Sequence, residues 1–144
     1  NDVIQHHYPA SPVSEKVRIA LGLKGLAWRS VEIPRVPPKP DGMPLTGGYR
    51  RTPMMQIGAD IFCDSHCILR ELPTAPEAGD PKDPQGFRPG AKVGVVPDLD
   101  SGEATVIGTV RRIEPDSIAI LRDDPRVGSV CVNFPRVGYR SSAA

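Results

Sequence analysis

The hydrophobic positions in the first half of the chain alternate between strand and helix periods. Residues 3–8 form a short apolar run of strand length, and residues 13–24 carry mostly apolar side chains at helical spacing. Gly22 and Gly25 end this predicted helix. A second strand is predicted at residues 28–33. After it, from residue 34 to 44, proline recurs too densely for any regular element to continue.

A hairpin and a second helix are predicted next. Residues 54–57 and 61–63 are apolar and flank the turn Gly58-Ala59-Asp60. Asp64 or Ser65 can cap the following helix, which Pro73 ends. The order of elements predicts a mixed sheet with flanking helices, in which a right-handed crossover joins the first two strands.

The second half of the chain has only strand patterns. The stretch TAPEAGDPKDPQG, residues 74–86, has no apolar periodicity and indicates a linker. Beyond it, four or five short strands separated by tight turns predict a small barrel or curled sheet. We therefore predict an α/β domain at 1–73, a linker at 74–87 and a small all-β, barrel-like module at 88–144.

Composition and charge exclude several classes of protein. The 144 residues carry a net charge of +1 and 5% aromatic residues, which argues against binding nucleic acid or an anionic membrane. No apolar run approaches the ~20 residues that span a bilayer, and the N-terminus lacks a signal-peptide pattern. An odd number of cysteines (Cys63, Cys67 and Cys131) does not indicate a secreted disulfide scaffold. The prediction is a cytoplasmic protein.

Ser11 stands where the first strand gives way to the first helix, directly before Pro12. Proline suits the first helical position, and the amides and dipole of a helix N-terminus favour a negative charge. A thiolate held there would be stabilised by the serine hydroxyl, and each unit of thiol pKa depression corresponds to about 1.4 kcal/mol. Ser11 can equally be a plain helix cap. The residues alone leave both interpretations open.

Two dipeptides could complete a site around Ser11. Thr52-Pro53 precedes a predicted strand, and a cis bond there would turn the main chain of Thr52 toward an extended peptide. Asp64-Ser65 begins the second helix, where it could hold a carboxylate and a cationic amine. The simpler alternatives are an ordinary trans proline and a pair of helix caps.

The stretches SPVSEKVRIALGLKGLAW and RRTPMMQIGADIFCDSHCILREL together resemble the N-terminal, thioredoxin-like domain of glutathione S-transferases, over about residues 3–72. The resemblance implies that Ser11 activates the thiol of glutathione as co-substrate. It also implies that Thr52 contacts the cysteinyl unit with Pro53 cis, and that Asp64 and Ser65 hold the γ-glutamyl end. The pair Arg50-Arg51 beside Gly47-Gly48 could also contact an anionic ligand, and Arg51 is included among the expected glutathione-binding residues; the simpler alternative is a solvated loop. A bacterial origin is suggested by the trailing β segment.

Serine in place of cysteine favours conjugation, because serine cannot form the mixed disulfide of a glutaredoxin-like enzyme. The usual helical domain, which builds the electrophile site, is replaced here by strands, and so activity is left uncertain. The alternatives are a non-catalytic scaffold whose β module binds a protein partner, and a truncated or fused form. We expect residues 88–140 to cover the apolar face of the first domain, or a homodimer to bury it.

Three other groups of residues are not expected to form a functional site. A zinc site at Cys63, His66 and Cys67 is not expected because the spacing falls short of usual zinc sites. Of the adjacent His6 and His7 on the first strand, one is expected to point inward and one outward. The pair Arg111-Arg112 is expected to place one arginine on each face of a strand.

Overall fold

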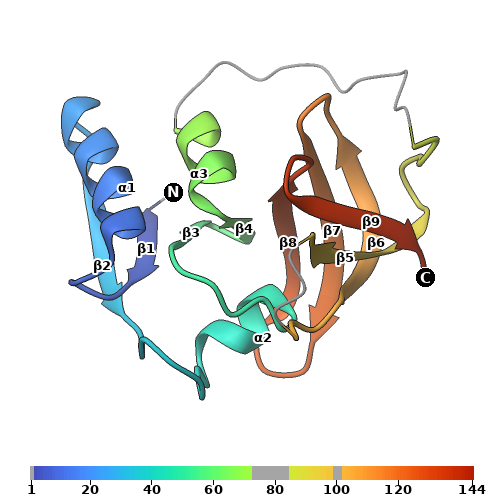
Figure 1. The fold of residues 1–144 in the computed structure, drawn as a ribbon, viewed down its shortest axis with the longest axis horizontal. Helices are drawn as coiled ribbons and strands as arrows, with labels where there is room; N and C mark the ends of the chain where they lie inside the picture. Colours follow the sequence, from blue (N-terminus) through green and yellow to red (C-terminus); the bar gives the residue numbers. More distant parts are fainter. Residues whose placement is uncertain (1, 73–84, 99–101) are drawn as a thin grey trace.

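The computed structural model describes residues 2–72, 85–98 and 102–144. Within these residues nine strands form one sheet. Figure 1 shows two helices beside the first four strands, a short third helix near the lower end of the second group of strands, and that second group as a strongly curled sheet. The predicted domain boundaries at 73/74 and 87/88 cannot be followed in full, because residues 73–84 lie outside the described residues.

The first half folds with the predicted elements. β1 (Val3–His7) pairs in parallel with β2 (Trp28–Glu32) across the helix α1 (Pro12–Leu23), and antiparallel with β3 (Met54–Ile57). The hairpin is completed by β4 (Asp60–Cys63), and α3 (Ser65–Glu71) follows. This is the mixed sheet with flanking helices of a thioredoxin-like domain.

One prediction for this half is wrong. The proline-rich stretch 34–44 does not exclude regular structure throughout, because α2 (Gly42–Thr46) begins within it. Pro44 is the third residue of this short helix. The first four N–H groups of a helix have no intrahelical partner, so a proline in the first turn removes no hydrogen bond. Gly47, with φ of 77°, then ends the helix.

The two helices α1 and α3 pack against the same face of the sheet. Val17 and Leu21 from α1 meet Ile68 from α3 over Met55 and Phe62 of the strands, and all five side chains are buried. Because this face is occupied by the helices, the β module must use the other face or an edge of the sheet.

The second half forms five strands: β5 (Lys92–Pro97), β6 (Val106–Ile113), β7 (Ser117–Asp124), β8 (Gly128–Pro135) and β9 (Tyr139–Ala143). Their pairings with one another are all antiparallel, and β9 extends beyond β5 at the end of the sheet. The full strand order is β2-β1-β3-β4-β8-β7-β6-β5-β9. The predicted curled sheet is therefore present. The apolar pattern of the sequence did not predict β9 as a separate strand.

The two halves share a sheet and a core. β8 lies parallel to β4, with Ile61 opposite Val132. On the face away from α1 and α3, Met54, Ile61 and Cys63 form one buried cluster with β-module side chains, among them Val132 and Phe134. The predicted docking of residues 88–140 on the first half is confirmed, with the difference that β8 adds to the sheet edge and the module covers the face opposite α1 and α3.

His6 and His7 are both buried, which contradicts the expectation of one inward and one outward side chain. The reason is the central place of β1 in the sheet, between β2 and β3, where both faces are covered. His6 pairs with Gln56 at 3.3 Å, and His7 contacts Ser30 at 2.7 Å and Arg18 at 2.8 Å.

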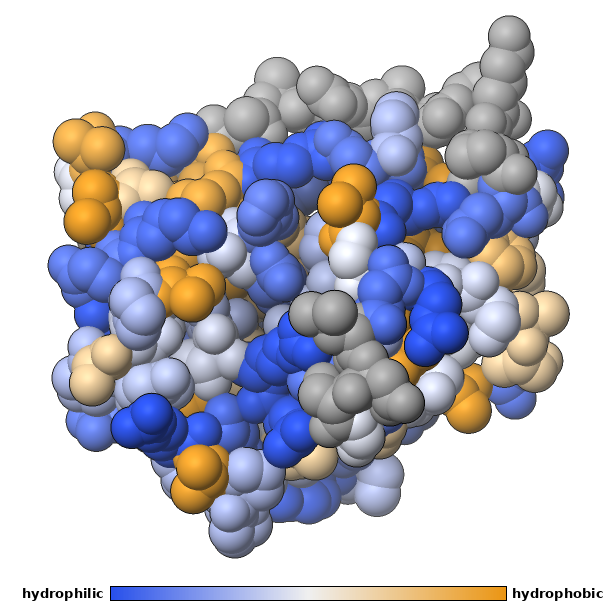
Figure 2. All heavy atoms as spheres, in the orientation of Figure 1, coloured by the Kyte–Doolittle hydropathy of each residue, from blue (hydrophilic) through white to orange (hydrophobic). Residues whose placement is uncertain are grey.

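The surface seen in Figure 2 carries apolar side chains scattered among polar ones rather than as one large patch. The helices of the described residues include none that is long and apolar enough to cross a membrane.

Candidate functional site

Ser11 is the N-cap of α1. Its Oγ accepts a hydrogen bond from the Ser14 N–H at 3.1 Å, and its own N–H donates to the Tyr8 carbonyl. The residue is only 3% exposed. The cap role is therefore confirmed. Because the oxygen acts as acceptor in this cap, the hydroxyl proton is left to donate to a further group.

Thr52 and Pro53 lie at the same end of the sheet as Ser11. β1 and β3 are antiparallel neighbours with His6 opposite Met54, so the chain leaving β1 toward Ser11 meets the chain reaching β3 through Thr52. The Thr52–Pro53 bond is cis, as predicted. Within the described part of the chain, no main-chain hydrogen bond involves Thr52. Its main-chain N–H and C=O can therefore pair with a bound peptide.

A groove of about 480 Å³ opens beside Thr52. Its charged lining comprises four cationic side chains and one carboxylate: Arg35, Lys39, Arg50, Arg51 and Glu103. The excess of positive charge suits an anionic ligand.

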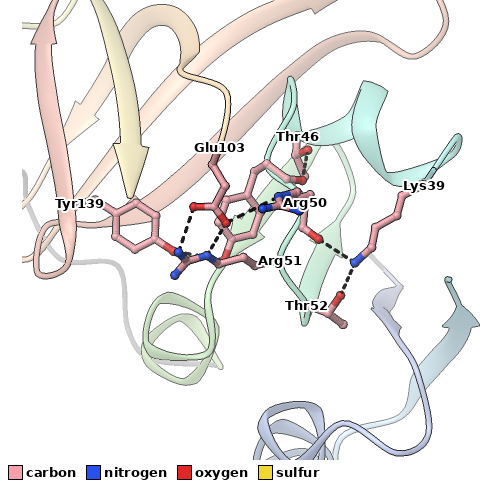
Figure 3. A network of polar contacts seen from close by, with 8 residues as sticks. Lys39, Thr46, Arg50, Arg51, Thr52, Glu103 and Tyr139 are labelled. Atoms are coloured by element: carbon pink, nitrogen blue, oxygen red, sulfur yellow. Dashed lines mark hydrogen bonds and ion pairs between the residues drawn. The ribbon is translucent and has the colours of Figure 1, made fainter. Parts of the chain in front are cut away.

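Lys39 anchors one side of the groove. Its ammonium donates to the Arg50 carbonyl at 2.6 Å and to Thr52 Oγ1 at 2.9 Å, and these contacts converge in Figure 3. Burial and the neighbouring Arg50 lower the pKa of Lys39. The lysine thus ties the proline-rich segment to the chain before β3 and holds Thr52 in place.

Arg51 is held by the β module. Its guanidinium donates to both carboxylate oxygens of Glu103, at 2.6 Å and 2.9 Å, and the Glu103 carboxylate also lies 3.9 Å from Arg50. The Glu103 side chain is 6% exposed. Hydrogen bonding to Glu103 raises the pKa of Arg51. The guanidinium of Arg51, for which an anionic ligand was expected, is thus already bound by a carboxylate of this chain.

Asp64 and Ser65 begin α3, as predicted, but they do not line the groove. Asp64 Oδ1 accepts from the His66 N–H at 2.9 Å, and Oδ2 accepts from the Tyr139 hydroxyl at 3.0 Å. Ser65 is buried. The structure therefore brings Arg51 and Thr52 into one groove, while Ser11, Asp64 and Ser65 lie outside its lining.

The sequence interpretation missed Lys39, Glu103 and Tyr139. Lys39 stands in the proline-rich stretch, which carried no motif. Glu103 and Tyr139 belong to the β module, and no local pattern indicates that they reach the first half. Only the docking of the module brings them to Arg51 and Asp64.

A second hollow, of about 500 Å³, lies on the sheet where β4 meets β8. Both Arg111 and Arg112 line it, which contradicts the expectation of one arginine per face. The pairing of β6 with β7 shifts register between Val110 and Arg112, and such a bulge turns an extra side chain to the same face. Cys131, also in this lining, has its pKa raised to about 11 by burial and by Asp60.

Comparison with known proteins supports the same fold. Residues 6–82, more than half of the chain, match the glutathione S-transferase N-terminal domain, and the chain belongs to this family. A crystal structure of a GST-like protein from Pseudomonas syringae superposes with a TM-score of 0.84 at 22% sequence identity, over 98% of this chain and all of that one. The shared fold includes the β-rich second half in place of the usual helical domain. A search of curated proteins found no match.

Proposed function

We propose that the protein binds glutathione in the groove beside Thr52 and activates its thiol for transfer to an electrophile. The observation that carries this proposal is the cationic groove at Thr52, at the same end of the sheet as the Ser11 cap. Membership of the glutathione S-transferase N-terminal family gives the ligand class.

The groove offers glutathione two kinds of contact. The main chain of Thr52 pairs with the cysteinyl unit as an added strand would. Lys39 and Arg35 hold a ligand carboxylate, since both cations line the groove and guanidinium and ammonium groups bind carboxylates through charge-assisted hydrogen bonds. Asp64 and Ser65 lie outside the groove lining, so the α-amino group is assigned to Asp64, with Ser65 beside it, for a ligand that extends beyond the groove.

Ser11 performs the activating step. Its hydroxyl donates to the glutathione sulfur, and the helix dipole adds to the stabilisation of the thiolate, so the thiol proton is released to solvent. The sulfur then attacks the electrophilic carbon with its lone pair, and the leaving group departs with the bonding pair. No disulfide forms with the protein at this position, because Ser11 has no sulfur. All three cysteines are free thiols, and we propose a reducing compartment, the cytoplasm.

The test compares wild type with Ser11→Ala and Ser11→Asp. Calorimetry measures the Kd of glutathione, and conjugation to chlorodinitrobenzene measures kcat. We expect Ser11→Ala to lower kcat by roughly a hundredfold, with a much smaller change in Kd, because the hydroxyl acts mainly on developing charge. Ser11→Asp keeps a capping oxygen but carries no hydroxyl donor, so it should keep the stability and lose the activity.

Ser142→Ala, an exposed position on β9, serves as the control and should behave as wild type. Equal kcat in wild type and Ser11→Ala would reduce Ser11 to a helix cap. Failure of the wild type to bind glutathione at all would refute the proposal and leave a non-catalytic scaffold.

A further inference from the structure

Three side chains from separate parts of the chain, two buried tyrosines and a half-buried aspartate, form a line of hydrogen bonds. The hydroxyl oxygens of Tyr49 and Tyr139 are 3.1 Å apart, and the Tyr139 oxygen is 3.0 Å from Asp64 Oδ2. Tyr49 follows α2, Tyr139 begins β9, and Asp64 caps α3. The β module therefore reaches a residue that the proposed function assigns to the ligand.

The direction of these bonds follows from the number of protons. An ionised carboxylate only accepts and a phenol has one proton, so Tyr139 donates to Asp64 and Tyr49 donates to Tyr139. Burial raises the pKa of both tyrosines above the usual value, which keeps both phenols protonated as donors. The Tyr139 hydroxyl is thus committed to the carboxylate of Asp64.

Both oxygens of Asp64 are held from different directions. The His66 N–H binds Oδ1 and the Tyr139 hydroxyl binds Oδ2. Each carboxylate oxygen has about two acceptor sites, so one site on each oxygen is left for a ligand ammonium group. With both oxygens held, the carboxylate cannot rotate, and a ligand need not order it on binding.

We propose that Tyr139 is a positioning residue, which orients Asp64 toward the α-amino group of the ligand and so makes β9 part of the ligand site. The inference rests on the proposed function. In this arrangement the β module supplies one wall of the site: Glu103 holds Arg51, and Tyr139 holds Asp64. Figure 3 draws Tyr139 beside the Arg51–Glu103 pair.

The experiment compares two ligands, glutathione and its deamino analogue, which lacks only the α-amino group. Calorimetry gives both Kd values for wild type, Tyr139→Phe and Asp64→Asn. We expect Tyr139→Phe to weaken glutathione binding by about fivefold to tenfold, the scale of one ordered side chain, without changing the Kd of the analogue. Asp64→Asn should abolish the preference for glutathione. In the Asp64→Asn background, adding Tyr139→Phe should leave the ratio of the two Kd values unchanged.

Arg140→Gln is the matched control, since Arg140 is the next residue on β9, is exposed and pairs with Asp98 at 3.4 Å. It should bind both ligands as the wild type does. An unchanged Kd of the analogue also shows that each variant is folded.

A wild type that binds glutathione while Tyr139→Phe changes neither Kd, or both Kd values equally, would overturn the positioning role and leave the proposed function standing. An Asp64→Asn variant that keeps the full preference for glutathione would overturn it too. A wild type that binds neither ligand would remove the proposed function and this inference with it.

Discussion

Phe134→Ala should destabilise both halves of the protein together. Phe134 lies on β8, the strand that joins the β module to β4, and it is 1% exposed. Its ring centroid is 5.8 Å from those of Tyr49 and Tyr139, edge-to-face with the first and tilted against the second. The substitution therefore opens a cavity in the shared core, next to the tyrosines that bind each other and Asp64.

The expected loss of unfolding free energy is about 3–5 kcal/mol, the range for truncating a buried phenylalanine to alanine. The two aromatic contacts place it in the upper part of this range, since each such pair adds about 0.5–1.5 kcal/mol beyond its buried area. A domain of this size has a stability of about 5–15 kcal/mol. The variant should therefore retain a folded state with a much lower denaturation midpoint.

Urea unfolding followed by circular dichroism and by the fluorescence of Trp28 checks this prediction. Trp28 is the single tryptophan of the chain and lies on β2, in the half opposite to the substitution. Because the core is continuous, both signals should shift to the same lower midpoint. Val137→Ala, at a position 83% exposed, should leave the midpoint unchanged.

Two results would refute the reasoning. A loss of less than about 1 kcal/mol would mean that Phe134 does not fill a tightly packed core. Separate transitions, with the tryptophan signal unmoved, would mean that the two halves unfold independently and that the shared sheet contributes little coupling.

Three further predictions concern charges and thiols. Glu103→Gln should lower the unfolding free energy by about 1–2 kcal/mol, as measured by urea titration. The reason is that it removes a charge-assisted pair whose partner, Arg51, is partly exposed. An unchanged unfolding free energy would contradict the pairing. At neutral pH the folded protein should react slowly with iodoacetamide at Cys131 alone, with a rate that rises about tenfold per pH unit toward its pKa of about 11. Mass spectrometry of the labelled sites would disprove this if either buried cysteine reacts first. Burial lowers the pKa of His6 and His7 from the ordinary 6.5, so the unfolded chain binds more protons than the folded protein near this pH. The unfolding free energy should therefore fall as the pH drops below 6.5. In a His6→Asn variant the unfolding free energy should fall less steeply with pH.

Local patterns in the sequence were sufficient for most of the helices and strands and for the positions of the site motifs. A helix cap, a turn and an apolar period depend on residues a few positions apart, so Ser11, the Gly58 turn and the Asp64 cap could be placed without a partner. The exception, α2, also has a local reason, because a proline in a first helical turn breaks no hydrogen bond.

The pairing of β4 with β8 was decided only by the tertiary structure. Alternation along a strand indicates which face is buried but carries no information on which edge is paired or by which strand. The burial of both His6 and His7 has the same origin, since it depends on β1 lying between two other strands. The common face of Arg111 and Arg112 follows from a bulge, which a strict two-residue period cannot predict.

The contacts of Arg51 with Glu103 and of Asp64 with Tyr139 depend on the same pairing. Their partners are separated by 52 and 75 positions along the chain, and none of the four residues carries a local signal for the other. The sequence by itself predicted most of the residues that we propose bind glutathione. The docking of the β module determined which of those residues are already held, because side chains so distant in sequence meet only after the sheet has closed around a common core.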